Sequence, residues 1–132
     1  MLDTNICSYI IRNHPQQVIT KLQDIVNKRH RVVVSAITYS ELKYGAISKK
    51  ASPKHVGIVN DFMKRIDDVI AWDRESVDEA TIIKKYLSDK GILISNNDIA
   101  IAGNAIAHSC VLVTNNTGEF KRIPHLLLEN WV

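Results

Sequence analysis

The spacing of hydrophobic and polar positions changes repeatedly along the chain, and each change marks an expected element. Unbroken β-branched runs are typical of strands buried in a parallel sheet, whereas apolar residues three or four positions apart indicate helices with one buried face. The pattern predicts strands at residues 1–2, 31–38, 69–73, 111–116 and 126–132, the last at a sheet edge. It predicts helices from residue 4 or 5 to 13, from 15 to 26, and at 39–50, 53–66, 75–89 and 97–109.

This alternation of strands and helices predicts an α/β fold. Successive strands separated by helices form parallel sheets, and the connecting helices cover both faces. The helix at 97–109 is apolar on nearly all sides, so we expect it to be central and buried. The 132 residues contain no internal repeat, low-complexity run or linker, and we therefore predict a single domain over 1–132.

Composition narrows the function classes only slightly. The 45% hydrophobic and 23% charged fractions are typical of a globular protein. No stretch approaches the roughly 20 apolar residues of a membrane span, and no secretion signal is apparent, so we expect a cytoplasmic protein without membrane contact. Cys7 and Cys110 are isolated and are expected to be reduced thiols. The net charge of +3 weakly favours a polyanionic partner, and the five histidines lack zinc-ligand spacing.

Four acidic residues lie where predicted strands end or helices begin. Asp3 follows the first strand, Glu41 follows the strand that ends near Thr38, Asp98 opens the buried helix, and Glu119 follows the strand at 111–116. Ligands of open parallel sheets bind outside the carboxyl ends of the strands. We therefore expect the four carboxylates to share one edge of the sheet.

Each acid also has a purely structural interpretation. Asp3 fits a helix N-cap, Thr38-x-x-Glu41 and Ser95-x-x-Asp98 resemble capping boxes, and the fourth acid fits a solvated turn. Taken singly, these interpretations are favoured. Taken together, they leave the convergence unexplained, because two carboxylates about 4 Å apart repel by roughly 4 kcal/mol at an effective dielectric constant of 20. A cation offsets that repulsion, and hard oxygen ligands favour Mg²⁺ or Mn²⁺.

Polar residues accompany the acids in the sequence. Thr4, Asn5, Thr114 and Asn116 can orient carboxylates or metal-bound water. Turn and cap chemistry explains each of them equally well when it is considered alone.

Four motifs together carry a resemblance that covers essentially the whole chain. "MLDTN", "SAITYSELKYGA", "NNDIAIAGNAI" and "LVTNNTGEF" followed by "KRIP" and "ENWV" resemble a PIN-domain ribonuclease of the VapC toxin family. The resemblance implies a three-layer fold with metal-binding acids at Asp3, Glu41 and Asp98. It places a less regular fourth acid at Glu119 and matches Thr114 and Asn116 to polar residues of the family.

The resemblance also implies a function. It implies Mg²⁺- or Mn²⁺-dependent RNA cleavage, a toxin role, and neutralisation by a VapB-type antitoxin that places a basic side chain among the acids. Similar members cut the anticodon loop of initiator transfer RNA. We further expect a homodimer, through apolar helices near Tyr44 and residues 59–62. The chain departs from the pattern in its short first strand, in Glu119 instead of aspartate, and in Asn104, where close relatives often have histidine.

The expected mechanism is metal-assisted hydrolysis of a phosphodiester. Asp3 and Asp98 would hold the main ion, Glu41 would hold a second ion or orient the attacking water, and Glu119 would act through water. Two alternatives stay open. A receiver-like Mg²⁺-binding signalling module has a similar size and pocket, although "MLDTN" lacks its acid pair and "VLVTNN" its late lysine. The second alternative is a catalytically inactive PIN-like scaffold.

Overall fold

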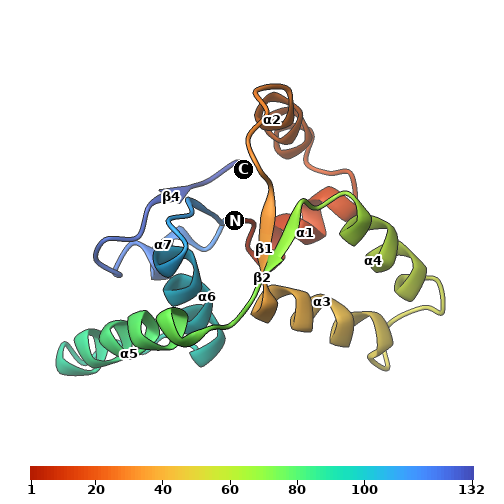
Figure 1. The fold of residues 1–132 in the computed structure, drawn as a ribbon. Coiled ribbons are helices and arrows are strands. Elements are labelled where there is room, and N and C mark those ends of the chain that lie inside the picture. Colours follow the sequence, from red (N-terminus) through yellow and green to blue (C-terminus); the bar gives the residue numbers. More distant parts are fainter.

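The computed structural model describes residues 1–132 and contains seven helices and four short strands (Figure 1), with a pair of helices before each of the first three strands and a single helix before the last. The helices are α1 (Thr4–Ile11), α2 (Gln16–Asn27), α3 (Ala36–Ile47), α4 (His55–Lys64), α5 (Arg74–Asp89), α6 (Asn96–Ala107) and α7 (Thr117–Phe120). The strands are β1 (Val33–Ser35), β2 (Asp68–Ile70), β3 (Leu112–Val113) and β4 (Leu128–Glu129).

The strands form one parallel sheet that is joined at its centre by a single residue. β1 pairs with β2 and β3 pairs with β4, both in parallel. Leu2 bridges Val34 on one side and Val113 on the other. Its amide donates to the Val33 carbonyl at 2.8 Å, and the amide of Asp3 donates to the Val113 carbonyl at 2.9 Å. The predicted parallel sheet and the edge position of the last strand are confirmed, and the expected strand at residues 1–2 is reduced to the two isolated bridges of Leu2.

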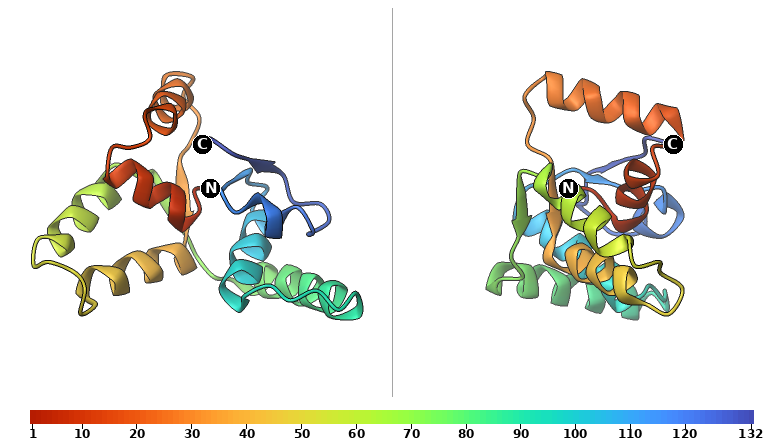
Figure 2. Two further views of the ribbon diagram at one scale, coloured as in Figure 1. Left: turned by 180° about the vertical axis from the view of Figure 1, so that it is seen from behind. Right: turned by 90° about the vertical axis from the view of Figure 1, so that its right-hand side faces the viewer.

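Helices cover both faces of the sheet, as expected. Helices α1 to α4 lie on one side and α5 to α7 on the other (Figures 1 and 2). Strand side chains alternate between the two cores because successive residues of a strand point to opposite faces. Leu2, Val34 and Val113 pack with α1 to α4, whereas Met1, Val33 and Leu112 pack with α5 to α7.

The strands are shorter than the sequence predicted, and a helix cap is one reason. The run at 31–38 forms a strand only at Val33–Ser35, because the Ser35 side chain accepts a hydrogen bond from the amide of Ile37 at 3.1 Å and starts α3 there. The predicted start at residue 39 is wrong, and so is the capping box of Thr38 and Glu41, because both residues lie inside the helix. Similarly, β2 ends at Ile70 and β3 at Val113.

Helix α6 is buried in the centre of its layer, as predicted. Ile101, Ala102, Asn104 and Ala105 have no exposed surface. A Cβ atom on Gly103 would lie 2.7 Å from the backbone nitrogen of Ala80, so α5 and α6 touch at the level of the backbone. Glycine is required at this crossing because any side chain would force the two helices apart.

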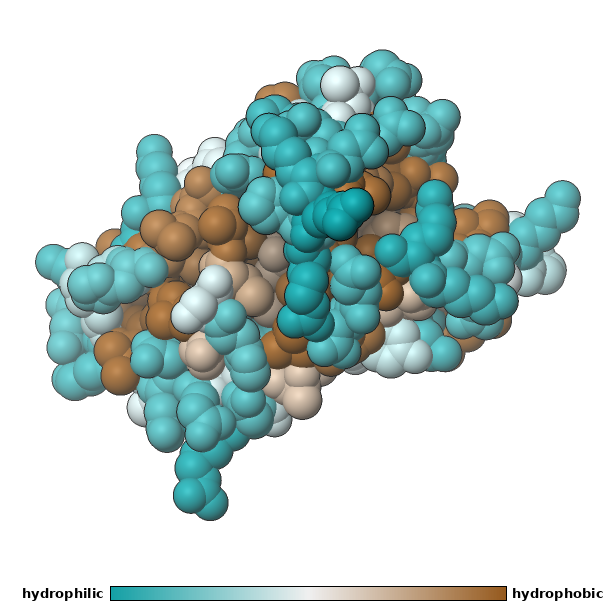
Figure 3. Space-filling view, turned by 45° about the horizontal axis from the view of Figure 1, so that its top comes forward, coloured by the Kyte–Doolittle hydropathy of each residue, from teal (hydrophilic) through white to brown (hydrophobic).

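The residues expected to form a self-association face lie in two different environments. Tyr44 on α3 is 72% exposed, but Val59 and Phe62 are buried in the core beneath α4. These two side chains are therefore unavailable to a second copy, and that part of the predicted face is wrong. Apolar surface nevertheless remains uncovered, and Figure 3 shows it as brown areas beside hydrophilic side chains. No helix combines the length and apolar character required to cross a membrane.

Candidate active site

Asp3 follows the central residue of the sheet, and its side chain has two roles. One carboxylate oxygen, Oδ1, accepts from the amide of Thr4 at 2.8 Å and caps α1. The other, Oδ2, accepts from the hydroxyl of Thr114 at 2.7 Å. Burial is the main cause that raises the pKa of Asp3, and the charge of Glu41 adds to the increase. Asp3 is thus both a helix cap and a buried carboxylate that faces another acid.

Asp98 lies in the first turn of α6 and faces the same region. Its amide donates to the Ser95 hydroxyl at 3.2 Å, which is the cap that the Ser95-x-x-Asp98 spacing indicated. Burial raises the pKa of Asp98 to about 6, and the charges of Asp3 and Glu119 contribute to that increase. The carboxylate is therefore partly protonated near neutral pH when no cation is bound.

Glu119 lies in the short helix α7 rather than in a solvated turn. The side-chain amide of Asn116 is directed at two carboxylates, 3.5 Å from Asp98 Oδ2 and 3.3 Å from Glu119 Oε2. The backbone amide of Asn116 donates to the Thr114 hydroxyl at 2.9 Å, which connects this pair with Asp3. Asn116 therefore lies between two acids, as its sequence position suggested.

Glu41 approaches the site from α3. The hydroxyl of Thr4 donates to Glu41 Oε1 at 2.7 Å and lies 3.4 Å from the hydroxyl of Thr38. Thr38 is fully buried, and the sequence analysis had considered it only as a cap. The conjunction of Thr38 with Glu41, one helical turn apart, was the signal that could have placed both residues at the site.

Asn5 differs from the other polar residues because its side chain hydrogen-bonds to a backbone amide instead of a carboxylate. Its side-chain oxygen accepts from the backbone amide of Asn115 at 3.4 Å, and the Asn115 side chain donates to the hydroxyl of Tyr9 at 3.2 Å. Asn5 therefore holds the loop after β3 against α1, and this loop carries Thr114 and Asn116.

Together the four acids form a negatively charged site without an internal cation. None of the five salt bridges of the protein involves Asp3, Glu41, Asp98 or Glu119. No three acidic, histidine or cysteine side chains are close enough to enclose a metal ion. Mg²⁺ fits such a donor set, because it is usually bound by one or two carboxylates and keeps several waters.

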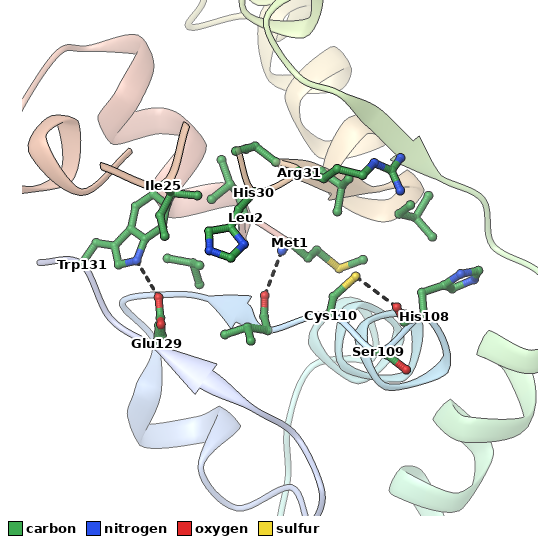
Figure 4. Close-up of a pocket in the computed structure, with 15 residues that line it drawn as sticks. Met1, Leu2, Ile25, His30, Arg31, His108, Ser109, Cys110, Glu129 and Trp131 are labelled. Carbon is green, nitrogen blue, oxygen red and sulfur yellow. Dashed lines mark hydrogen bonds between the residues drawn. The ribbon is translucent and has the colours of Figure 1, made fainter. Parts of the chain in front are cut away.

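Of three well-formed hollows in the protein surface, one reaches an acid of the site, Glu41. A hollow of about 280 Å³ between α1, α3 and α4 is lined by Thr4 and Glu41. Two larger ones, of about 440 and 450 Å³, contain none of the four acids. The first of these surrounds Met1, with Cys110 and Trp131 in its wall (Figure 4).

Comparisons with known proteins agree with this geometry. The profile of the PIN domain matches residues 1–126. The chain is 39% identical to ribonuclease VapC2 of Rickettsia felis, over 99% of this chain and 96% of that protein. It is 34% identical to the tRNA(fMet)-specific endonuclease VapC of Salmonella typhimurium, over 99% of this chain and 96% of that protein. The crystal structure of VapBC2 from Rickettsia felis bound to a promoter DNA fragment superposes with a TM-score of 0.90 at 38% identity, covering 100% of this chain and 98% of that one.

Proposed function

Because the chain belongs to the VapC family of PIN-domain proteins, we propose that it is a metal-dependent endoribonuclease and the toxin of a toxin–antitoxin pair. The observation that carries the proposal is the group of four carboxylates at the carboxyl edge of the sheet, where no basic side chain forms a salt bridge with them. Proteins tolerate such repulsion where a cation binds. The ribonuclease names of the relatives support the same reaction class.

Each acid has a role in this proposal. Asp3 and Asp98 would hold a Mg²⁺ or Mn²⁺ ion, Glu41 would hold a second ion or orient the attacking water, and Glu119 would act through water. A bound ion lowers the pKa of water and stabilises negative charge on the phosphate.

The polar residues around the acids fix their orientation. The Thr114 hydroxyl holds Asp3 and the Thr4 hydroxyl holds Glu41, each through a 2.7 Å hydrogen bond. These short bonds keep the two carboxylates in place before any ion or RNA binds.

The proposed substrate is RNA, and more specifically the anticodon loop of initiator transfer RNA. The name of the Salmonella relative supports this specificity. The net charge of +3 supports binding to a polyanion. Contacts between basic side chains and phosphates make such affinity fall as salt rises. Acting on transfer RNA places the protein in the cytoplasm.

The proposed partner is a VapB-type antitoxin, supported by the VapBC assembly among the similar structures. A basic antitoxin side chain inserted among Asp3, Glu41 and Asp98 would supply the positive charge that this chain lacks there. The uncovered apolar surface fits a protein partner as well. A homodimer is also proposed, and the exposed Tyr44 is the part of the predicted face that stays accessible to a second copy.

The direct test is cleavage of RNA by the purified protein. We expect a synthetic initiator-tRNA anticodon stem-loop to be cut in the presence of Mg²⁺ and to stay intact in excess EDTA. Asp98→Asn, in which the helix start is kept but a charge is removed, is the matched control and should be inactive. Millimolar Mg²⁺ should also raise the melting temperature of the parent protein, because an ion that binds only the folded state stabilises it.

Other outcomes would select the remaining alternative. A parent protein that binds the stem-loop but never cleaves any RNA, with Mg²⁺ or Mn²⁺, would identify a catalytically inactive PIN-like scaffold. The family match argues against the receiver-like signalling module.

A further inference from the structure

The hollow of about 280 Å³ beside Glu41 has the composition of a ligand site, and we name it the Gly45 pocket. It lies between α1, α3 and α4, and its wall includes Gly45, Arg12 and His55. We propose that the Gly45 pocket receives one unstacked base of the RNA substrate, while Arg12 binds an adjacent phosphate. This inference rests on the proposed ribonuclease function and adds a substrate subsite to it.

The Gly45 pocket is continuous with the acids. Thr4 and Glu41 line the pocket and are joined to each other by the 2.7 Å hydrogen bond. Thr4 also follows Asp3 directly and donates its amide to the Asp3 carboxylate. A nucleotide whose phosphate lies at the acids can therefore place a neighbouring base in the pocket without leaving the protein surface.

The floor of the pocket is apolar and the volume is small. It consists of Ile11, Leu42, Ala46, Ile58 and Val59, from three different helices. The volume is just below the roughly 300–1,000 Å³ of typical small-molecule sites, which suits one base better than a larger ligand. Proteins read single-stranded RNA loops by holding unstacked bases against side chains, and an apolar floor provides such a surface.

The rim of the pocket carries one unpaired cationic side chain, that of Arg12. Arg12 is exposed, packs its guanidinium over the ring of Tyr9 with 5.3 Å to the ring centre, and takes part in none of the salt bridges. Its donors are therefore free, and a guanidinium binds phosphate through two parallel hydrogen bonds. This charge favours a nucleic acid over an apolar protein segment as the occupant.

His55 gives the rim a hydrogen-bond donor of fixed orientation. Its ring nitrogen Nδ1 accepts from the backbone amide of Ser52 at 2.8 Å. The neutral ring therefore carries its proton on Nε2, which is left to donate to an acceptor on the edge of a base.

Gly45 keeps the pocket open. A Cβ atom at Gly45 would meet no atom within 4 Å, and the residue lies in the interior of α3, where glycine costs about 1 kcal/mol relative to alanine. A larger side chain would strengthen the helix and project into empty space at the pocket wall. Gly57 in α4 is equally open but does not line the pocket, so it provides a matched control.

The test is a double-mutant cycle that combines changes in the protein with changes in the RNA, and equilibrium binding affinity is the measured quantity. Labelled anticodon stem-loops, each with one abasic nucleotide next to the cleavage position and a non-hydrolysable linkage at that position, are titrated with the parent, Gly45→Leu and Gly57→Leu proteins in Mg²⁺, and fluorescence anisotropy gives Kd. In the parent, we expect one abasic position to weaken binding about tenfold, the range for loss of one stacked base. Gly45→Leu should weaken binding of the intact loop similarly and abolish the abasic effect. Gly57→Leu should match the parent, and both variants should melt at or above its temperature.

The outcomes separate this inference from the proposed function. Equal binding and an unchanged abasic effect in Gly45→Leu would overturn the subsite, even if the parent cleaves RNA normally. Failure of the parent to cleave with Mg²⁺ would overturn the ribonuclease proposal, while the binding cycle would still decide the pocket. A Gly45→Leu protein that binds RNA like the parent but no longer forms a complex with the antitoxin would reassign the pocket to the protein partner and overturn the RNA subsite.

Discussion

Asp3 and Asp73 perform the same local task in very different surroundings. Each is the N-cap of a helix, Asp3 of α1 and Asp73 of α5, and each accepts a hydrogen bond from a backbone amide of the first turn. The pKa of Asp3 is raised, mainly by burial, whereas hydrogen bonds from Ser76 lower the pKa of Asp73 and His108 lowers it further. Burial and neighbouring charge, rather than the cap itself, separate the two residues.

Most of the polar side-chain atoms around Asp73 have a hydrogen-bond partner. Its Oδ1 accepts from the Ser76 hydroxyl at 2.6 Å, and its Oδ2 lies 2.8 Å from His108 Nε2. The Asn104 side chain donates to the Ser76 hydroxyl at 2.8 Å and to the Ala71 carbonyl at 3.0 Å. This network fixes the start of α5 against α6, and it places Asn104 in a structural role with no hydrogen bond to the four acids. Around Asp3, by contrast, further carboxylates accumulate without a cation.

The largest expected effect is the difference in RNA cleavage between the Asp3→Asn and Asp73→Asn variants. Asparagine caps helices about as well as aspartate, so both variants should fold. Asp3→Asn should lower RNA cleavage at least about 100-fold, because the proposed ion would lose a ligand, while the metal-free protein keeps or gains stability as repulsion is relieved. Asp73→Asn should keep parental cleavage and lose some stability. Cleavage assays measure the activity of both variants, and thermal melts measure their stability. Parental activity in Asp3→Asn would show that Asp3 serves only as a helix cap.

The contributions of the two regions to folding stability should also change with pH in opposite directions. The folded pKa of Asp98 is about 6, above its unfolded value, so the folded state binds more protons between these values and stability falls as pH rises from about 4 to 7. The lowered pKa of Asp73 has the opposite sign, and its contribution is lost only as pH falls below its ordinary value.

Urea unfolding in EDTA across this range tests the predicted slope. Asp98→Asn should flatten it relative to the parent, and millimolar Mg²⁺ should reduce it in the parent alone. An identical slope in the parent and in Asp98→Asn would assign the effect to other groups.

Ser76→Ala should have a smaller effect that is confined to stability. The substitution removes the hydroxyl between Asp73 and Asn104 and leaves the buried Asn104 amide with one partner fewer. The expected cost is about 1–3 kcal/mol in the free energy of unfolding, with cleavage unchanged. Denaturant titration measures the cost. A loss of cleavage in a fully folded Ser76→Ala protein would show that the two regions are coupled.

The smallest effect is expected for His108→Gln, which replaces the partly exposed hydrogen-bond partner of Asp73. Polar contacts between partly exposed side chains contribute little because water competes for both partners, so the melting temperature should change by no more than a few degrees. A larger loss would mean that His108 supports the α5–α6 junction through packing.

The sequence predicted the layers, the parallel sheet and the edge where the acids meet, because these features follow from periodicity and strand order. It misplaced the start of α3, since Ser35 lies within a β-branched run and its cap forms only where the chain turns out of the sheet. The pairing of Asp73 with His108 depends on how α5 and α6 cross, which no local pattern encodes. An apolar stripe also does not reveal which molecule covers it, and Val59 and Phe62 are covered by their own chain.

The junction at Leu2 has a consequence for synthesis of the protein. Leu2 completes the sheet only by pairing with both Val34 and Val113, and the Thr114–Asp3 hydrogen bond joins residues 111 positions apart. Translation proceeds at about 5–20 residues per second, so Asp3 waits on the order of ten seconds for its partners to leave the ribosome. The nascent chain therefore carries no assembled cluster of carboxylates for most of its elongation. The fold itself delays assembly of the candidate active site until the last part of the chain is made.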